Sequence, residues 1–215
     1  MSTGLFSRAT RRLRKEVETL KSWIYRALLS MSCWWHGGVL VAGPRLRAQH
    51  RTIFQGDGCL RIGADVTLGY TLAGFPCMPI VLQPRNAGAE IVIGDGTYLM
   101  NGSLFVACEA IHVGADCRIG GNCIVLDSDF HGLRPSERNT VGKTAPVTIG
   151  DNVWLGVSVT VLKGVRIGND AVVGAQTVIA KDVPAGAIAV GNPMRIIGSV
   201  YDLPPDDQIR ARTDA

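Results

Sequence analysis

Residues 149–184 read IGDNVW LGVSVT VLKGVR IGNDAV VGAQTV IAKDVP, which is six consecutive blocks of six residues. Each block begins with Ile, Leu or Val, and four of the six carry Gly in second place. The fifth place holds small or β-branched residues, namely Val153, Val159, Val165, Ala171, Thr177 and Val183. Six residues are too few for a helix with its turn, but they fit one short strand and one turn. The repeat therefore predicts a solenoid of stacked parallel strands.

The same blocks recur earlier, at 113–130, 93–110 and 62–73, with a register slip near Ile111 and some irregularity between Ala73 and Ile93. We expect first-place residues to fill the interior and fifth-place residues to fit the corners. We expect second-place Gly to permit backbone conformations that other residues resist. Cys117 and Cys123 occupy fifth places, which predicts core thiols. The alternative, a β-sandwich with chance Ile-Gly pairs, is disfavoured by six unbroken blocks.

The sequence divides into three parts. Residues 1–45 form a basic amphipathic helical segment, residues 46–198 the β-helix domain, and residues 199–215 a tail. Within residues 4–31, apolar side chains recur at helical spacing among basic residues and Trp. These are Leu13, Val17, Leu20, Ile24, Leu28 and Met31. We expect this apolar side to pack on the solenoid or on a neighbouring subunit. Contact with an anionic membrane surface is the alternative.

Composition narrows the class of protein. The chain is 47% hydrophobic and 19% charged, as folded globular chains are, and its net charge of +4 does not by itself imply nucleic acid. None of the six cysteines forms a CxxC pair, and no apolar run reaches the roughly 18–20 residues of a membrane span. We see no secretory signal. We therefore expect reduced thiols in a cytoplasmic protein, peripheral at the inner face of the membrane if the helix binds lipid.

The solenoid is interrupted over residues 131–148, HGLRPSERNTVGKTAPVT, a polar segment with two prolines. Val125 and Ile149 are 24 positions apart, a whole number of blocks, so the segment should loop out and rejoin in phase. Of the four histidines, His131 stands where the coil ends and the loop departs, whereas His112 falls at an outward-facing place. Imidazole suits a base near neutral pH, and loops on rigid scaffolds commonly carry function.

The stretch Asp129-Phe130-His131, the Arg-containing loop and Pro146 to Trp154 resemble the hexapeptide-repeat galactoside, maltose and capsule or lipopolysaccharide O-acetyltransferases. Lys181-Asp182-Val183-Pro184 and Gly191-Asn192-Pro193 extend the resemblance, which covers residues 90–198. It implies a left-handed parallel β-helix, a homotrimer, and direct acetyl transfer from acetyl-CoA to a hydroxyl of a sugar or polysaccharide precursor. It also implies that His131 is the general base.

The resemblance assigns further residues to the site. Asp129 would orient the histidine or contact the acceptor, and Asn101 would lie near the acceptor. The resemblance places acetyl-CoA in a groove between subunits, along Trp154, Gly156, Val157, Gly174, Ala175, Ala180, Lys181 and Arg195, with Lys163 as a further cation. It implies no metal.

Two other functions remain open. A hexapeptide-repeat carbonic anhydrase needs about three histidines around a metal, and only His112 and His131 are placed to meet. A non-catalytic scaffold has no need of a base. A variant of the transferase would use an acyl carrier protein or a nucleotide-sugar amine. The acceptor is not determined by these residues.

Overall fold

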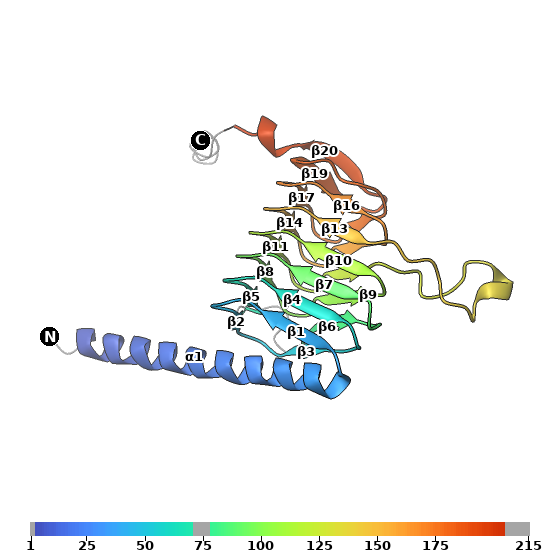
Figure 1. The fold of residues 1–215 in the computed structure, drawn as a ribbon. Coiled ribbons are helices and arrows are strands. Elements are labelled where there is room, and N and C mark those ends of the chain that lie inside the picture. Colours follow the sequence, from blue (N-terminus) through green and yellow to red (C-terminus); the bar gives the residue numbers. More distant parts are fainter. Residues whose placement is uncertain (1–2, 71–77, 205–215) are drawn as a thin grey trace.

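The computed structural model describes residues 3–70 and 78–204, including helix side chains of Leu13 and from Glu16 onward. Its strands wind into a left-handed parallel β-helix with a long helix, α1 (Thr3–His36), across the N-terminal end (Figure 1). The predicted fold class is thus confirmed.

The described strands form three sheets that run the length of the solenoid. In the first lie β1 (Val39–Ala42), β4 (Cys59–Ile62), β7 (Glu90–Ile93), β10 (Ala110–Val113), β13 (Val147–Ile149) and β16 (Arg166–Ile167). In the second lie β2 (Arg47–Ala48), β5 (Thr67–Leu68), β8 (Tyr98–Leu99), β11 (Arg118–Ile119), β14 (Trp154–Leu155), β17 (Val172–Val173), β19 (Ala187–Val190) and β20 (Arg195–Ser199). In the third lie β3 (Thr52–Phe54), β6 (Ile80–Pro84), β9 (Leu104–Ala107), β12 (Ile124–Leu126), β15 (Thr160–Val161) and β18 (Val178–Ile179). Pairing is parallel except between β19 and β20.

The core follows the six-residue repeat as predicted. First-place residues from Ile149 to Ile179 and fifth-place residues from Val153 to Val183 are buried. Cys117 and Cys123 are buried free thiols among them. Across the interruption, Val113 pairs with Ile149, so the chain does rejoin the coil in phase.

The expectation for second-place glycine holds at Gly69 (φ 84°), but over residues 93–184 no second-place glycine has a positive φ angle. Positive φ angles in that range fall mainly in the fourth place of the blocks, as at Asp116 (55°), Asn152 (54°) and Asp170 (60°). Asp and Asn tolerate this left-handed conformation better than most residues do. Second-place glycine is needed because successive coils stack too closely for a side chain. A Cβ on Gly156 would lie 2.7 Å from the backbone N of Ala175.

Helix α1 closes the N-terminal end of the solenoid. Leu29 and Cys33 are buried against the first coil. The Ser22 hydroxyl accepts a hydrogen bond from the Ala48 amide (3.1 Å), and the Ser32 hydroxyl accepts one from the Phe54 amide (3.2 Å). The helix therefore shields the interior and occupies backbone donors of the first strands.

Two expectations about the N-terminal region differ from the structure. The first coil begins at Val39, before the boundary expected at residue 46, because α1 ends at His36. The apolar stripe of α1 does not pack on its own solenoid. Its members are exposed, while another side of the helix faces the coil. Over residues 3–70 and 78–204, no helix is long and apolar enough to cross a bilayer.

Candidate active site

The excursion that carries His131 leaves the solenoid after β12, contains the short 3-10 helix η1 (Pro135–Glu137), and projects from the side of the molecule (Figure 1). A buried carboxylate, that of Asp127, holds the segment where the excursion leaves the solenoid. Asp127 accepts hydrogen bonds from the amides of Cys108 and Glu109, both at 2.7 Å, and its own carbonyl accepts one from Ala145 at 2.9 Å. Burial raises the pKa of Asp127, while these amides oppose the shift. An antiparallel bridge between Ser128 and Thr144 joins the outgoing and returning strands of the excursion. We call this paired segment, residues 127–129 and 143–145, the neck of the excursion.

The His131 imidazole is exposed and is oriented by the backbone of its own loop. Its Nδ1 lies 2.9 Å from the carbonyl oxygen of Arg138, the residue that ends η1. A carbonyl oxygen can only accept, so Nδ1 must be the donor. The proton of the neutral ring is then on Nδ1, and the lone pair is on Nε2. The loop therefore holds His131 in the tautomer that a base acting through Nε2 requires.

Asp129 lies at the same neck but faces the solenoid. Its Oδ2 is 3.5 Å from the Nζ of Lys163, which follows β15 on the next coil. The hydrogen bonds of the described residues include none between Asp129 and His131, since Arg138 occupies Nδ1. Asp129 also borders a pocket of about 360 Å³ within the excursion, together with Gly132, Leu133, Arg134, Glu137, Thr140, Val141, Gly142 and Lys143. Its contact with an acceptor stays a prediction.

Asn101 is buried, and its amide binds the backbone of Tyr70. Its Oδ1 accepts from the Tyr70 amide and its Nδ2 donates to the Tyr70 carbonyl, both at 3.0 Å. In this structure Asn101 thus anchors the chain just after β5, where the described residues stop at Tyr70. A role toward the acceptor stays a prediction.

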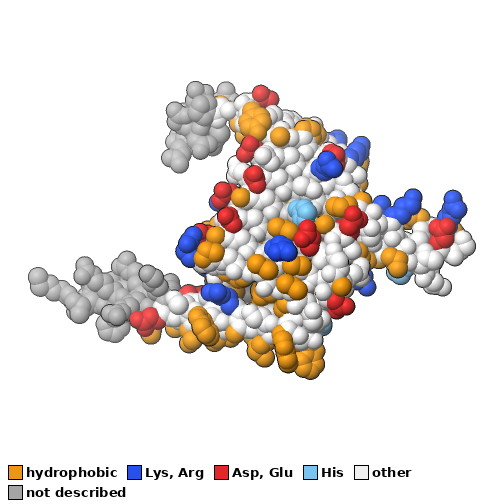
Figure 2. Space-filling model, viewed as in Figure 1, with side chains coloured by type: hydrophobic (Ala, Val, Ile, Leu, Met, Phe, Trp, Pro, Cys, Tyr) orange, Lys and Arg blue, Asp and Glu red, His pale blue; other side chains and the backbone are white. Residues whose placement is uncertain are grey.

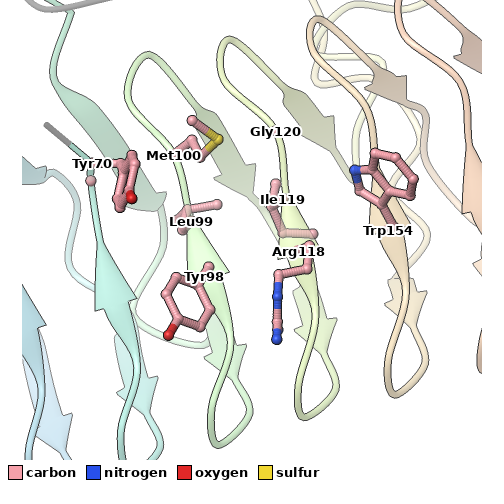
Figure 3. A pocket seen from close by; sticks show the side chains of 9 residues that line it. Tyr70, Tyr98, Leu99, Met100, Arg118, Ile119, Gly120 and Trp154 are labelled. Atoms are coloured by element: carbon pink, nitrogen blue, oxygen red, sulfur yellow. The ribbon is translucent and has the colours of Figure 1, made fainter. Parts of the chain in front are cut away.

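Trp154 is 57% exposed on β14 and belongs to an aromatic pocket of about 390 Å³ (Figure 3). Tyr70, Tyr98, Met100 and Arg118 also line it, and the Arg118 guanidinium lies 4.7 Å from the centre of the Tyr98 ring. Of these residues, only Trp154 was predicted from the sequence to belong to the site. The sequence does carry a signal for this cluster, because Tyr98, Arg118 and Trp154 each take the sixth place of the first block of a coil and stand in register on neighbouring strands.

The residues predicted to hold acetyl-CoA fall on two corners of the solenoid. Gly156, Val157, Gly174 and Ala175 follow strands of the second sheet, β14 and β17. Ala180 and Lys181 follow β18 of the third sheet. The His131 loop departs from the same corner of the solenoid two coils earlier, after β12. Arg195 is exposed on β20. One subunit brings His131, Lys163 and Lys181 to one corner, and the glycines to another.

Among the described residues, no group of three or more His, Cys, Asp or Glu side chains is placed to hold a metal ion. His112 Nε2 is 2.8 Å from Glu90 Oε1 on the outer face of the first sheet. This pairing places His112 on the surface, as predicted.

Residues 146–181 match the bacterial transferase hexapeptide family of six repeats. This segment is therefore similar to the repeats of bacterial hexapeptide transferases. It is 33% identical over 116 residues to the galactoside O-acetyltransferase of Escherichia coli, which covers 54% of this chain and 57% of that protein. The galactoside O-acetyltransferase of Lactococcus lactis is 34% identical over 116 residues, covering 54% and 56%. The chain thus spans little more than half the length of these curated relatives.

Solved structures share the fold. The polysialic acid O-acetyltransferase OatWY superposes with a TM-score of 0.61 at 24% identity, covering 79% of this chain and 83% of that chain. The hexapeptide-repeat acetyltransferase VCA0836 of Vibrio cholerae, in complex with acetyl coenzyme A, superposes with a TM-score of 0.52 at 20% identity, covering 94% and 91%. At these identities the likeness supports the fold alone.

Proposed function

We propose that this chain is an O-acetyltransferase that moves the acetyl group of acetyl-CoA to a hydroxyl of a sugar or a polysaccharide precursor. The observation that supports it most is the hydrogen bond from His131 Nδ1 to the Arg138 carbonyl, which leaves Nε2 as a free base. The relatives named as galactoside O-acetyltransferases, and the neighbour solved with acetyl coenzyme A, support the choice of donor and of acceptor class.

The reaction needs no covalent enzyme intermediate. His131 Nε2 takes the proton of the acceptor hydroxyl as its oxygen attacks the thioester carbonyl. The tetrahedral intermediate then collapses, the carbon–sulfur bond breaks, and the CoA thiolate takes the proton back from the imidazolium. The ester and free CoA are the products, and all atoms and charges balance. The fixed tautomer of His131 lowers the cost of orienting the base.

We propose that the active unit is a homotrimer with acetyl-CoA between subunits. The support is the division of predicted site residues between two corners of one chain, with the third sheet lying between them. A groove formed by two copies would join the His131 corner of one chain to Trp154, Gly156 and Ala175 of its neighbour. Lys181 and Arg195 would supply cations for the CoA phosphates. Light scattering of the purified protein should give three times the 22.9-kDa chain mass.

The experiment that tests the function is acetyl-CoA turnover, followed by thiol release, against a panel of sugars, glycosides and lipid-linked glycans. The proposal requires release that depends on the acceptor, with the acetyl ester found on the acceptor by mass spectrometry. Calorimetric titration with CoA serves as a separate reading of donor binding. No acceptor-dependent release and no CoA binding would instead favour a non-catalytic solenoid or a different donor.

A further inference from the structure

Helix α1 presents an exposed apolar face on the side away from the first coil. Leu13, Leu20 and Met31 are 61%, 63% and 64% exposed, and Ile24 is 49% exposed on the same face. Val17 and Leu28 complete the stripe, and Trp23, Trp34 and Trp35 border it at 71%, 80% and 79% exposure. Figure 2 shows hydrophobic side chains along the side of α1 that faces away from the solenoid. A contiguous apolar patch of this kind marks an interaction surface.

The orientation of the face follows from the helix geometry. Ser22, Leu29 and Cys33 turn toward the first coil, where Ser22 binds the Ala48 amide. Ile24 is two residues beyond Ser22, and two residues turn a helix by about 200°. The packed face and the apolar face are therefore opposite one another. Because α1 crosses the end of the solenoid, the apolar face lies at the outer extremity of the molecule and is not recessed (Figure 1).

The positive charge of α1 favours an anionic membrane over a second copy of the chain as the partner of the apolar face. Residues 3–36 contain seven Lys and Arg against two Glu, a net charge of +5, whereas the whole chain carries +4. An apolar stripe bordered by Trp on a basic helix fits the interface of a membrane with anionic headgroups, where rings and methyl groups enter the acyl boundary. A second copy docked on the same face would bring two strongly positive helices together, which Coulomb repulsion disfavours.

We propose that α1 is a membrane-docking helix, which lays its apolar face into an anionic lipid surface and stands the solenoid on the membrane by its N-terminal end. This goes beyond the proposed acetyl transfer and does not depend on it. If both hold, the proposed transferase site is carried on a solenoid that stands on a bilayer, which suits a lipid-linked glycan acceptor.

The test is flotation of the full chain with vesicles of phosphatidylcholine alone and of phosphatidylcholine mixed with phosphatidylglycerol. The wild type should float with the anionic vesicles, and raised salt should weaken that binding by screening. Leu20→Glu with Ile24→Glu should reduce the partition coefficient at least about tenfold, since each exposed carboxylate replaces a large apolar group. Ile197→Glu, at the opposite end and 64% exposed, is the matched control and should float like the wild type.

Three results would overturn the proposal. The first is a wild type that floats with neither vesicle, and the second is a double variant that floats as well as the wild type. The third is a wild type that forms larger assemblies than the double variant without lipid and does not float, which would assign the face to a second copy. Circular dichroism confirms that α1 is still folded in the variants. Acetyl transfer to a soluble acceptor should be unchanged by the double variant. Flotation therefore tests membrane docking, and the transfer assay tests the proposed activity independently of it.

Discussion

The Nδ1 atom of His131 donates a hydrogen bond to the carbonyl oxygen of Arg138 at 2.9 Å, so the loop that carries His131 also sets the tautomer of its ring. The carbonyl follows η1, and that turn is held by Thr140, whose amide (2.8 Å) and hydroxyl (2.7 Å) both donate to the Glu137 carbonyl. The position of the His131 ring therefore depends on hydrogen bonds within the excursion, not on a carboxylate partner.

Thr140 is then a positioning residue for the proposed reaction. Thr140→Val keeps the shape of the side chain but removes the hydroxyl bond, whose loss is worth about 1 kcal/mol, or roughly fivefold. We expect kcat to fall by about that factor with the KM for acetyl-CoA unchanged, because the donor is held elsewhere. Steady-state kinetics measures both. Thr140→Ser retains the hydroxyl and should restore kcat. A change confined to KM would rule this role out.

Asp127 should matter for stability. Asp127→Ala leaves the amides of Cys108 and Glu109 without their acceptor, which costs about 1–3 kcal/mol in the free energy of unfolding. Denaturant unfolding measures this cost, with the exposed Asp57→Ala as the control. Equal midpoints for the two variants would show that the carboxylate does not hold the neck of the excursion.

The same residue gives a pH dependence. Burial raises the pKa of Asp127 above the value of about 3.9 expected when unfolded, so folding favours its protonated form. Its contribution to stability is fully present below the unfolded pKa and declines as pH rises through the folded one. Wild type should therefore lose stability relative to Asp127→Ala between pH 4 and neutrality. A difference that grows over that range would contradict the direction of the shift.

Glycine in second place should be irreplaceable where coils stack. Gly156→Ala places a methyl group 2.7 Å from the Ala175 nitrogen, and such overpacking costs about 1–3 kcal/mol. Gly198 has no atom within 4 Å of an added Cβ and serves as the control. Thermal unfolding should show a lower Tm for Gly156→Ala only. An unchanged Tm would mean that the coils separate more readily than their geometry indicates.

The core thiols should be inert in the folded protein. Burial raises the pKa of Cys123 to about 11 from 9.0, so its thiolate fraction near pH 8 is about a hundredfold lower than that of an exposed thiol. Iodoacetamide labelling mapped by mass spectrometry should leave Cys117 and Cys123 unmodified until denaturant is added. Rapid labelling of either in the native state would show that the solenoid opens locally.

The repeat predicted the solenoid well because its period is set by one strand and one turn, so every block reports the same geometry. Buried first-place and fifth-place residues such as Leu155 and Val159 follow directly. The role of second-place glycine was misjudged because contact between neighbouring coils is not visible in a single block. For the apolar side of α1, packing on its own solenoid was wrong, because small residues such as Ser22 and Cys33 lie against the coil instead. Packing of that side on a neighbouring subunit stays a prediction.

The candidate site was predicted unevenly for a related reason. His131 stands at a sequence landmark, the end of an unbroken coil. Arg138, whose carbonyl oxygen accepts the hydrogen bond from His131, does not stand at such a landmark. Every residue has a backbone carbonyl, so the sequence gives no indication that this one binds the imidazole. Tyr98 and Arg118 join Trp154 only when equivalent blocks of successive coils are aligned as stacked strands. The proposed groove between copies of the chain has no sequence signal, and within one chain it is supported by the separation of Gly156 from Lys181.

The central claim is that His131 is the base, and one substitution tests it most directly. His131→Asn keeps a side-chain amide able to donate to the Arg138 carbonyl but has no basic nitrogen, so the loop should stay folded. With an acceptor that supports turnover, we predict that kcat falls by about a hundredfold or more while Kd for CoA and Tm are unchanged. A variant that turns over acetyl-CoA at the wild-type rate would contradict the account.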